Sequence, residues 1–130
     1  MEQSYRDHLA AVKRQIREQT PAEAAARRDA DPAPVLVDVR ERDEYVTERA
    51  SGAVLAPISE FAVRHGELPR DRPLLMICQS GSRSASATMF LLQGGWTDVR
   101  NVEGGTTAWA RAGLPTRHGE PEPGEGELPG

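Results

Sequence analysis

Two short runs of apolar residues stand out in the hydrophobic pattern of the chain. Residues 35–39 (Val-Leu-Val-Asp-Val) and 73–78 (Pro-Leu-Leu-Met-Ile-Cys) are almost continuously apolar. Continuous apolar character is typical of strands that are buried on both faces of a parallel sheet. A third segment, residues 96–102, places Val99 and Val102 among polar residues and predicts a shorter strand.

Helical patterns alternate with these strands. Apolar residues spaced about one and two turns apart predict an amphipathic helix within residues 1–15. In the segment 20–23 (Thr-Pro-Ala-Glu), Thr can cap a second helix, Pro suits its first position and Glu can reach back to the cap. Two more helices are expected at 83–93 and 106–112, and residues 16–18 can form an edge strand. Strands that alternate with helices predict an α/β fold with a mainly parallel sheet.

Length and composition restrict the class of protein. A chain of 130 residues, 38% apolar and 28% charged, suits one small domain with a real core. Nothing in the sequence approaches the roughly 20 apolar residues of a membrane span, so no membrane partner is expected. The charged first residues do not resemble a signal peptide. The single cysteine excludes an internal disulfide and a multi-cysteine metal site, which makes the reducing cytoplasm the expected compartment.

The C-terminal segment differs in composition from the rest of the chain. Residues 118–130 (HGEPEPGEGELPG) are rich in Pro and Gly, and their four glutamates account for the net charge of −4. Such a segment has too little apolar surface to offset the entropy of ordering, so a disordered tail is predicted. The chain then divides into a helix (1–15), a domain (16–117) and this tail. No basic stripe is visible, so nucleic acid is not an expected partner.

The stretch that carries chemistry is residues 74–84 (Leu-Leu-Met-Ile-Cys-Gln-Ser-Gly-Ser-Arg-Ser), where a buried strand ends at Cys78. Ligands of open α/β sheets bind beyond the carboxyl ends of the strands. Gly81 permits left-handed backbone angles, and a tight loop can turn successive N–H groups inward. The next helix start and Arg83 add positive charge. These features favour the thiolate form of Cys78 and predict that it is a nucleophile.

The loop after the cysteine is the candidate anion-binding loop, and each of its members also has a purely structural interpretation. The loop consists of Gln79, Ser80, Gly81, Ser82, Arg83 and Ser84. Ser82 or Ser84 can instead cap the following helix, and Arg83 can be an ordinary exposed residue of its first turn. Cys78 itself can be a small buried hydrophobic residue. The combination of strand end, Gly, Arg and helix start favours the functional interpretation.

Several motifs in order resemble the rhodanese (sulfurtransferase) family over most of the chain. Residues 36–45 (LVDVRERDEY) look like the first signature of the family, and Gly52-Ala53 looks like the second. Residues 78–84 (CQSGSRS) match its active-site loop. The closing signature is matched from 95 to 115, which includes Gly-Trp, Glu-Gly-Gly, Ala-Trp and Ala-Gly-Leu-Pro.

The resemblance implies a fold and a reaction. The fold is rhodanese-like, a central, mainly parallel, five-stranded sheet with helices on both faces. In the reaction, the Cys78 thiolate attacks the outer sulfur of a donor such as thiosulfate, sulfite leaves, and cyanide or a thiol takes the sulfur from the persulfide. The implied partners are the small sulfur donor, the acceptor and a sulfur-accepting protein, without metal or organic cofactor. Asp38 and Arg40 are expected to support the loop through a salt bridge, and not to react.

One segment departs from the family pattern. Residues 48–51 read Glu-Arg-Ala-Ser, whereas the family commonly has Gly-His-Ile-Pro before Gly-Ala. The missing Gly and Pro make the geometry of this turn an open point. The departure does not touch the cysteine loop.

Two alternative functions compete with sulfur transfer. Dual-specificity phosphatases of the same fold also pair a loop Cys with an Arg, but their loop is longer than the four residues between Cys78 and Arg83. A shorter loop encloses a smaller pocket, which suits one sulfur better than a phosphate. The other alternative is a non-catalytic binding or regulatory module, since many rhodanese-like domains have lost the cysteine.

Overall fold

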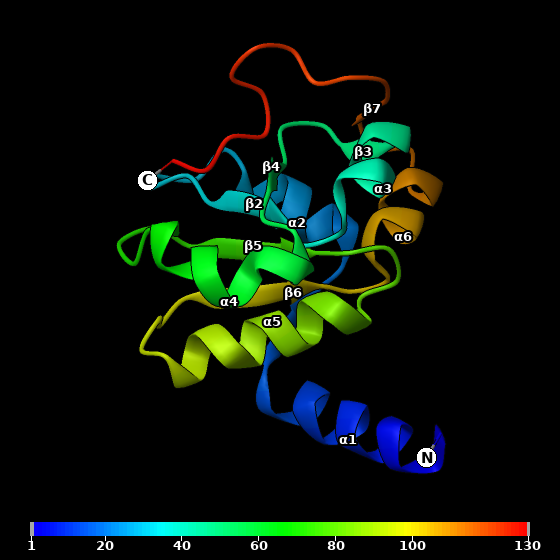
Figure 1. The fold of residues 1–130 in the computed structure, drawn as a ribbon, viewed down its shortest axis with the longest axis vertical. Helices are drawn as coiled ribbons and strands as arrows, with labels where there is room; N and C mark the ends of the chain where they lie inside the picture. Colours follow the sequence, from blue (N-terminus) through cyan, green and yellow to red (C-terminus); the bar gives the residue numbers. More distant parts are fainter. Residues whose placement is uncertain (1, 130) are drawn as a thin grey trace.

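The computed structural model describes residues 2–129 and is built around one central sheet (Figure 1). Two residues lie outside the described part of the chain: Met1, the first residue of the predicted N-terminal helix, and Gly130, the last residue of the predicted tail. In chain order the elements are α1 (Glu2–Gln15), β1 (Arg17–Gln19), α2 (Pro21–Arg27), β2 (Val35–Asp38), α3 (Arg42–Thr47), β3 (Arg49–Ala50), β4 (Val54–Leu55), η1 (Ile58–Glu60), α4 (Phe61–Arg64), η2 (His65–Glu67), β5 (Leu74–Ile77), α5 (Ser82–Gln93), β6 (Val99–Val102), α6 (Gly105–Arg111) and β7 (Thr116–Arg117).

The central sheet has five strands in the order β1-β6-β5-β2-β4. Every pair of neighbours in it is parallel, which confirms the predicted α/β fold. β5 pairs with both β2 and β6, so the strand that leads to Cys78 lies in the middle of the sheet. The edge strand β1 begins at Arg17, one residue later than the sequence pattern predicts.

The strands β2 and β5 are buried on both faces, as their apolar runs predict. Leu74, Met76 and Cys78 pack on one face with side chains of α4 and α5. Leu75 and Ile77 pack on the other face with side chains of α2, α3 and α6. Helices therefore cover both faces of the sheet (Figure 1). Because successive strand residues point to opposite faces, one strand supplies both cores.

The first two helices are placed by different features, α2 by its local sequence and α1 by its packing. α2 begins with the predicted capping box: the Glu23 N–H donates to Thr20 Oγ1, and the Thr20 N–H donates to Glu23 Oε1. α1 packs on the outer side of α5. Between residues 2 and 129, no helix is both long and apolar enough to cross a membrane.

The segment that departs from the family pattern forms part of a second, small sheet. In it β3 pairs antiparallel with β7. The turn after β3 is made by Gly52, whose φ of 86° needs a glycine, and by a hydrogen bond from the Arg28 guanidinium to the Ser51 carbonyl. The turn therefore forms without the family's Gly and Pro.

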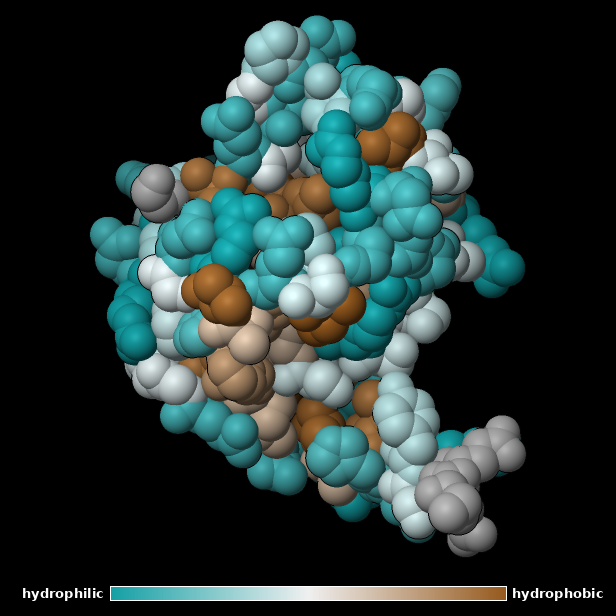
Figure 2. All heavy atoms as spheres, in the orientation of Figure 1, coloured by the Kyte–Doolittle hydropathy of each residue, from teal (hydrophilic) through white to brown (hydrophobic). Residues whose placement is uncertain are grey.

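The C-terminal segment differs from the predicted disordered tail because it is held against the body. The Leu55 N–H of edge strand β4 donates to the Gly126 carbonyl, and Glu125 forms a salt bridge with the buried Arg49. Leu128 packs against the larger core cluster. The segment crosses the top of the molecule as a mostly hydrophilic ridge (Figure 2). Composition predicts no order here because these contacts come from partners that are distant in sequence.

Candidate active site

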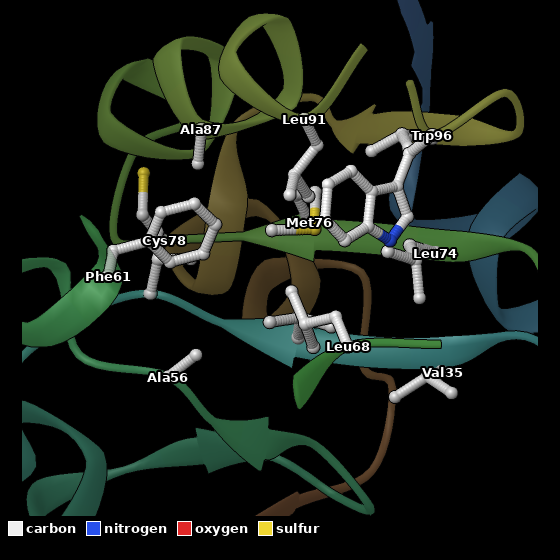
Figure 3. Close-up of a cluster of buried hydrophobic side chains, with 13 residues drawn as sticks. Val35, Ala56, Phe61, Leu68, Leu74, Met76, Cys78, Ala87, Leu91 and Trp96 are labelled. Carbon is white, nitrogen blue, oxygen red and sulfur yellow. The ribbon is translucent and has the colours of Figure 1, made fainter. Parts of the chain in front are cut away.

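Cys78 directly follows the central strand β5 and is fully buried. Its Sγ accepts a hydrogen bond from the Gly81 N–H at 3.1 Å and another from the Ser84 hydroxyl at 3.3 Å. Both partners are donors, the type of partner that stabilises negative charge on a sulfur atom. Phe61 of α4 and Ala87 of α5 lie beside the side chain (Figure 3). The sulfur is therefore reached from solvent only when neighbouring groups move.

The shape of the loop follows from glycine and from α6. Gly81 has a φ of 101°, which turns its N–H toward the sulfur. The carbonyls of Cys78 and Gln79 accept hydrogen bonds from the backbone N–H groups of Thr106 and Thr107, at 2.8 and 3.1 Å. A Cβ on Gly105 would lie 2.5 Å from the Cys78 carbonyl oxygen, so the loop and α6 touch closely.

None of the serines of the loop caps the helix α5. Gly81 is the N-cap of α5, and no side chain hydrogen-bonds there. Ser82 is the first residue of the helix, and the buried Ser84 directs its hydroxyl to Cys78. Ser80 is exposed. The structural alternative, in which Ser82 or Ser84 caps the helix, therefore does not hold, because Gly81 in a left-handed conformation is the N-cap.

Asp38 and Arg40 form the buried salt bridge that the sequence suggests. The Asp38 carboxylate accepts hydrogen bonds from Arg40 Nε and Nη2, at distances between 2.8 and 3.2 Å. Arg40 Nη1 then donates to Gln79 Oε1 at 2.9 Å, and Gln79 Nε2 donates to Thr107 Oγ1 at 2.8 Å. The chain of contacts links β2, the cysteine loop and α6. These hydrogen bonds therefore fix the position of the Gln79 side chain, directly after Cys78.

Arg83 makes an ion pair that the sequence analysis missed. Its two terminal nitrogens each donate to one oxygen of Glu44 at 2.8 Å, and both side chains are half-buried. Those hydrogen bonds lower the pKa of Glu44 from 4.5 to about 2 and raise the pKa of Arg83. Glu44 lies within the first signature, yet spacing along the chain could not show that it meets Arg83.

Asn101 of β6 is a second residue that the sequence analysis missed. It is fully buried, and its Nδ2 donates to the Gly81 carbonyl at 3.0 Å and to Glu18 Oε2 at 2.8 Å. The loop is thus held from β2, α3, β6 and α6. No group of three or more His, Cys, Asp or Glu side chains within the described part of the chain is placed to hold a metal ion.

Comparison with known proteins identifies the family of the chain. The family model described as "Rhodanese-like domain" matches residues 20–112, so the chain belongs to the rhodanese-like family. A protein named sulfurtransferase from Allochromatium vinosum is 39% identical over 95 residues, which cover 72% of this chain and 89% of that one.

Two other relatives show the range of the family. A rhodanese-related protein from Thermoplasma volcanium has a crystal structure that matches with a TM-score of 0.70 and 33% identity, over 78% of this chain and 97% of that one. The HTH-type transcriptional regulator Rv0324 of Mycobacterium tuberculosis is 34% identical over 103 residues, which cover 78% of this chain but 45% of the regulator. The same domain therefore occurs alone and within a larger regulator.

Proposed function

We propose that this protein is a sulfurtransferase that carries a sulfane sulfur as a persulfide on Cys78. The observation that carries the proposal is the placement of the only cysteine at the end of the central strand, with the Gly81 N–H and the Ser84 hydroxyl directed at its sulfur. A thiolate held by fixed donors is a ready nucleophile, and the same donors stabilise the charge that develops on a persulfide.

The proposed reaction has two displacement steps. The Cys78 thiolate attacks the outer sulfur of the donor, the S–S bond of the donor breaks, and its remainder leaves with the electron pair. Thiosulfate would release sulfite in this step. An acceptor such as cyanide or a thiol then attacks the outer sulfur of the Cys78 persulfide and restores the thiolate. With a single cysteine in the chain, the sulfur leaves to an external acceptor. We also propose a reducing compartment such as the cytoplasm.

The roles proposed for the other residues follow from their contacts. Gly81 and Ser84 stabilise the sulfur, and Gln79, Ser80, Ser82 and Arg83 line or shape the loop that receives the donor. Asp38 and Arg40 support the loop through Gln79 and take no part in bond making.

A mass measurement tests the proposal. After incubation with thiosulfate, or with the persulfide of N-acetylcysteamine, the protein should gain about 32 Da, the mass of one sulfur atom. Cyanide should remove this mass and release thiocyanate. Cys78→Ser should gain nothing, because a hydroxyl does not form a persulfide under these conditions. If neither donor adds sulfur to Cys78, the proposal fails.

A second candidate is a non-catalytic binding module. The burial of Cys78 favours it, since a nucleophile must be reached by its substrate. The two candidates differ in the mass experiment, because a binding module should remain unmodified even at high donor concentration.

A further inference from the structure

The positive charge of the cysteine loop is already neutralised within the protein. Arg83, the cation of the loop, is held by Glu44 through two hydrogen bonds of 2.8 Å. Glu44 is itself fixed, because the Glu41 N–H at the start of α3 donates to its Oε1 at 3.1 Å. The hydrogen bonds from Arg83 keep the pKa of Glu44 near 2, so the carboxylate stays charged at neutral pH.

The second arginine at the loop is neutralised in the same way. Arg40 reaches Gln79, but its Nε and Nη2 are bound to the buried Asp38. Beside the loop lies a depression of about 200 Å³ whose lining includes Arg40, Glu44, Glu48 and Gln79. The lining holds one arginine and two glutamates, so it carries an excess of negative charge.

The charge of the donor then decides how well it can react. Thiosulfate is a dianion, so three negative charges come together when the Cys78 thiolate attacks it. After the step these charges lie on the Cys78 persulfide anion and on the sulfite dianion. An organic persulfide reacts as its protonated form R–S–SH, because its anion R–S–S⁻ repels a thiolate: the Cys–S bond forms, the S–S bond breaks, the thiolate R–S⁻ leaves with the electron pair, and the proton stays on the transferred sulfur. This step gathers one negative charge. Like charges in a partly dehydrated site repel strongly.

We propose that Glu44 is a specificity-determining residue that neutralises Arg83 and thereby directs the site toward organic persulfides and away from thiosulfate. The inference rests on the proposed function, since it assumes that Cys78 accepts sulfur. It assigns to Glu44 no role in bond making. The carboxylate acts on the donor through Arg83.

The test compares two donors on matched variants. Rates of sulfur loading on Cys78 are measured by mass with thiosulfate and with the persulfide of N-acetylcysteamine, which has no other charged group. The wild type should load from the persulfide at least about tenfold faster than from thiosulfate. Glu44→Gln frees the Arg83 charge and should raise the thiosulfate rate about tenfold, with the persulfide rate changed less than about twofold.

Two control variants separate the release of Arg83 from a general change in charge. Glu48 lines the same depression without pairing with Arg83, so Glu48→Gln should raise the thiosulfate rate much less. In the double variant Glu44→Gln/Arg83→Gln, the gain should disappear, because no free cation remains. If Glu44→Gln leaves the thiosulfate rate unchanged, or if Glu48→Gln has the same effect, the inference is overturned.

A measurement on the wild type keeps the inference testable if a variant fails to fold. Thiosulfate loading should become faster as ionic strength rises, because salt screens repulsion between like charges, whereas persulfide loading should change little. A thiosulfate rate that falls with salt would contradict the inference and indicate an attractive site. Equal loading by both donors overturns the inference alone, whereas loading by neither overturns the proposed function.

Discussion

Two arginines in this protein are almost fully buried, and their surroundings differ. Arg40 is 2% exposed and Arg49 is 1% exposed. Arg40 binds Asp38, two residues earlier in the chain, and its remaining N–H groups reach Gln79 and the Glu48 carbonyl. Arg49 binds Glu125, 76 residues later, and the Gly119 carbonyl, both in the C-terminal segment.

Both arginines need a carboxylate partner, but one finds it nearby in the chain and the other finds it in the C-terminal segment. A buried guanidinium must be paired, because desolvation of an unpaired charge is costly. Arg40 meets this demand within its own strand end, so its spare donors are available to position the cysteine loop. Arg49 has no such local carboxylate in its contacts and binds the tail, while its Nη2 has no hydrogen-bond partner. Arg49 lies in the segment that departs from the family pattern, and its carboxylate partner comes from the C-terminal segment.

The largest expected effect is the loss of the Asp38 charge. Asp38→Asn should lower the free energy of unfolding by about 3–5 kcal/mol, because it leaves Arg40 charged and buried without its carboxylate. Urea denaturation measures this change. The loading of Cys78 with sulfur should also become slower, since Arg40 no longer positions Gln79. Asp43→Asn on the exposed side of α3 is the control, and an equal loss in that variant would contradict the assignment.

A smaller effect is expected at the second arginine. Glu125→Gln should lower the free energy of unfolding by about 1–2 kcal/mol, because Glu125 is partly exposed and water can reach the site. Amide exchange at Leu55, whose N–H donates to Gly126, should become faster as the tail detaches. Sulfur loading should not change. Glu127→Gln serves as the control, and a loss of loading in Glu125→Gln would contradict the separation of the two regions.

The smallest effect concerns acid stability. The pKa of Glu44 is about 2 in the folded protein and 4.5 when free, so the stabilisation from its pair with Arg83 is fully present above pH 4.5. It decreases as the pH falls from 4.5 toward 2, because protonation must then break the pair. Solvent screening of this half-buried pair limits the contribution to about 1 kcal/mol.

The difference in unfolding free energy between the wild type and Glu44→Gln, followed between pH 7 and 3, measures that contribution. The difference should shrink as the solution becomes more acidic. Glu67→Gln, in an exposed pair with Arg64, is a comparison variant. A difference that grows toward acid pH would contradict the expected sign.

Much of the fold could be predicted because it depends on neighbours in sequence. The apolar runs of β2 and β5, the capping box of α2 and the glycine of the cysteine loop all act over a few residues. The short strands β3, β4 and β7 were missed, since two residues are too few to show a period. The partners of the loop were missed for another reason: nothing along the chain relates Glu44 to Arg83 or Asn101 to Gly81.

The sequence by itself determined that a lone cysteine follows a buried strand and precedes a glycine turn and a helix, because these features depend on local backbone preferences and burial patterns. Only the tertiary structure decided which charges meet. It brought Glu44 to Arg83 and Glu125 to Arg49, and it covered the cysteine sulfur with side chains from α4 and α5. The physical reason is that a charge acts over a few ångströms in space, whatever the number of residues between the partners.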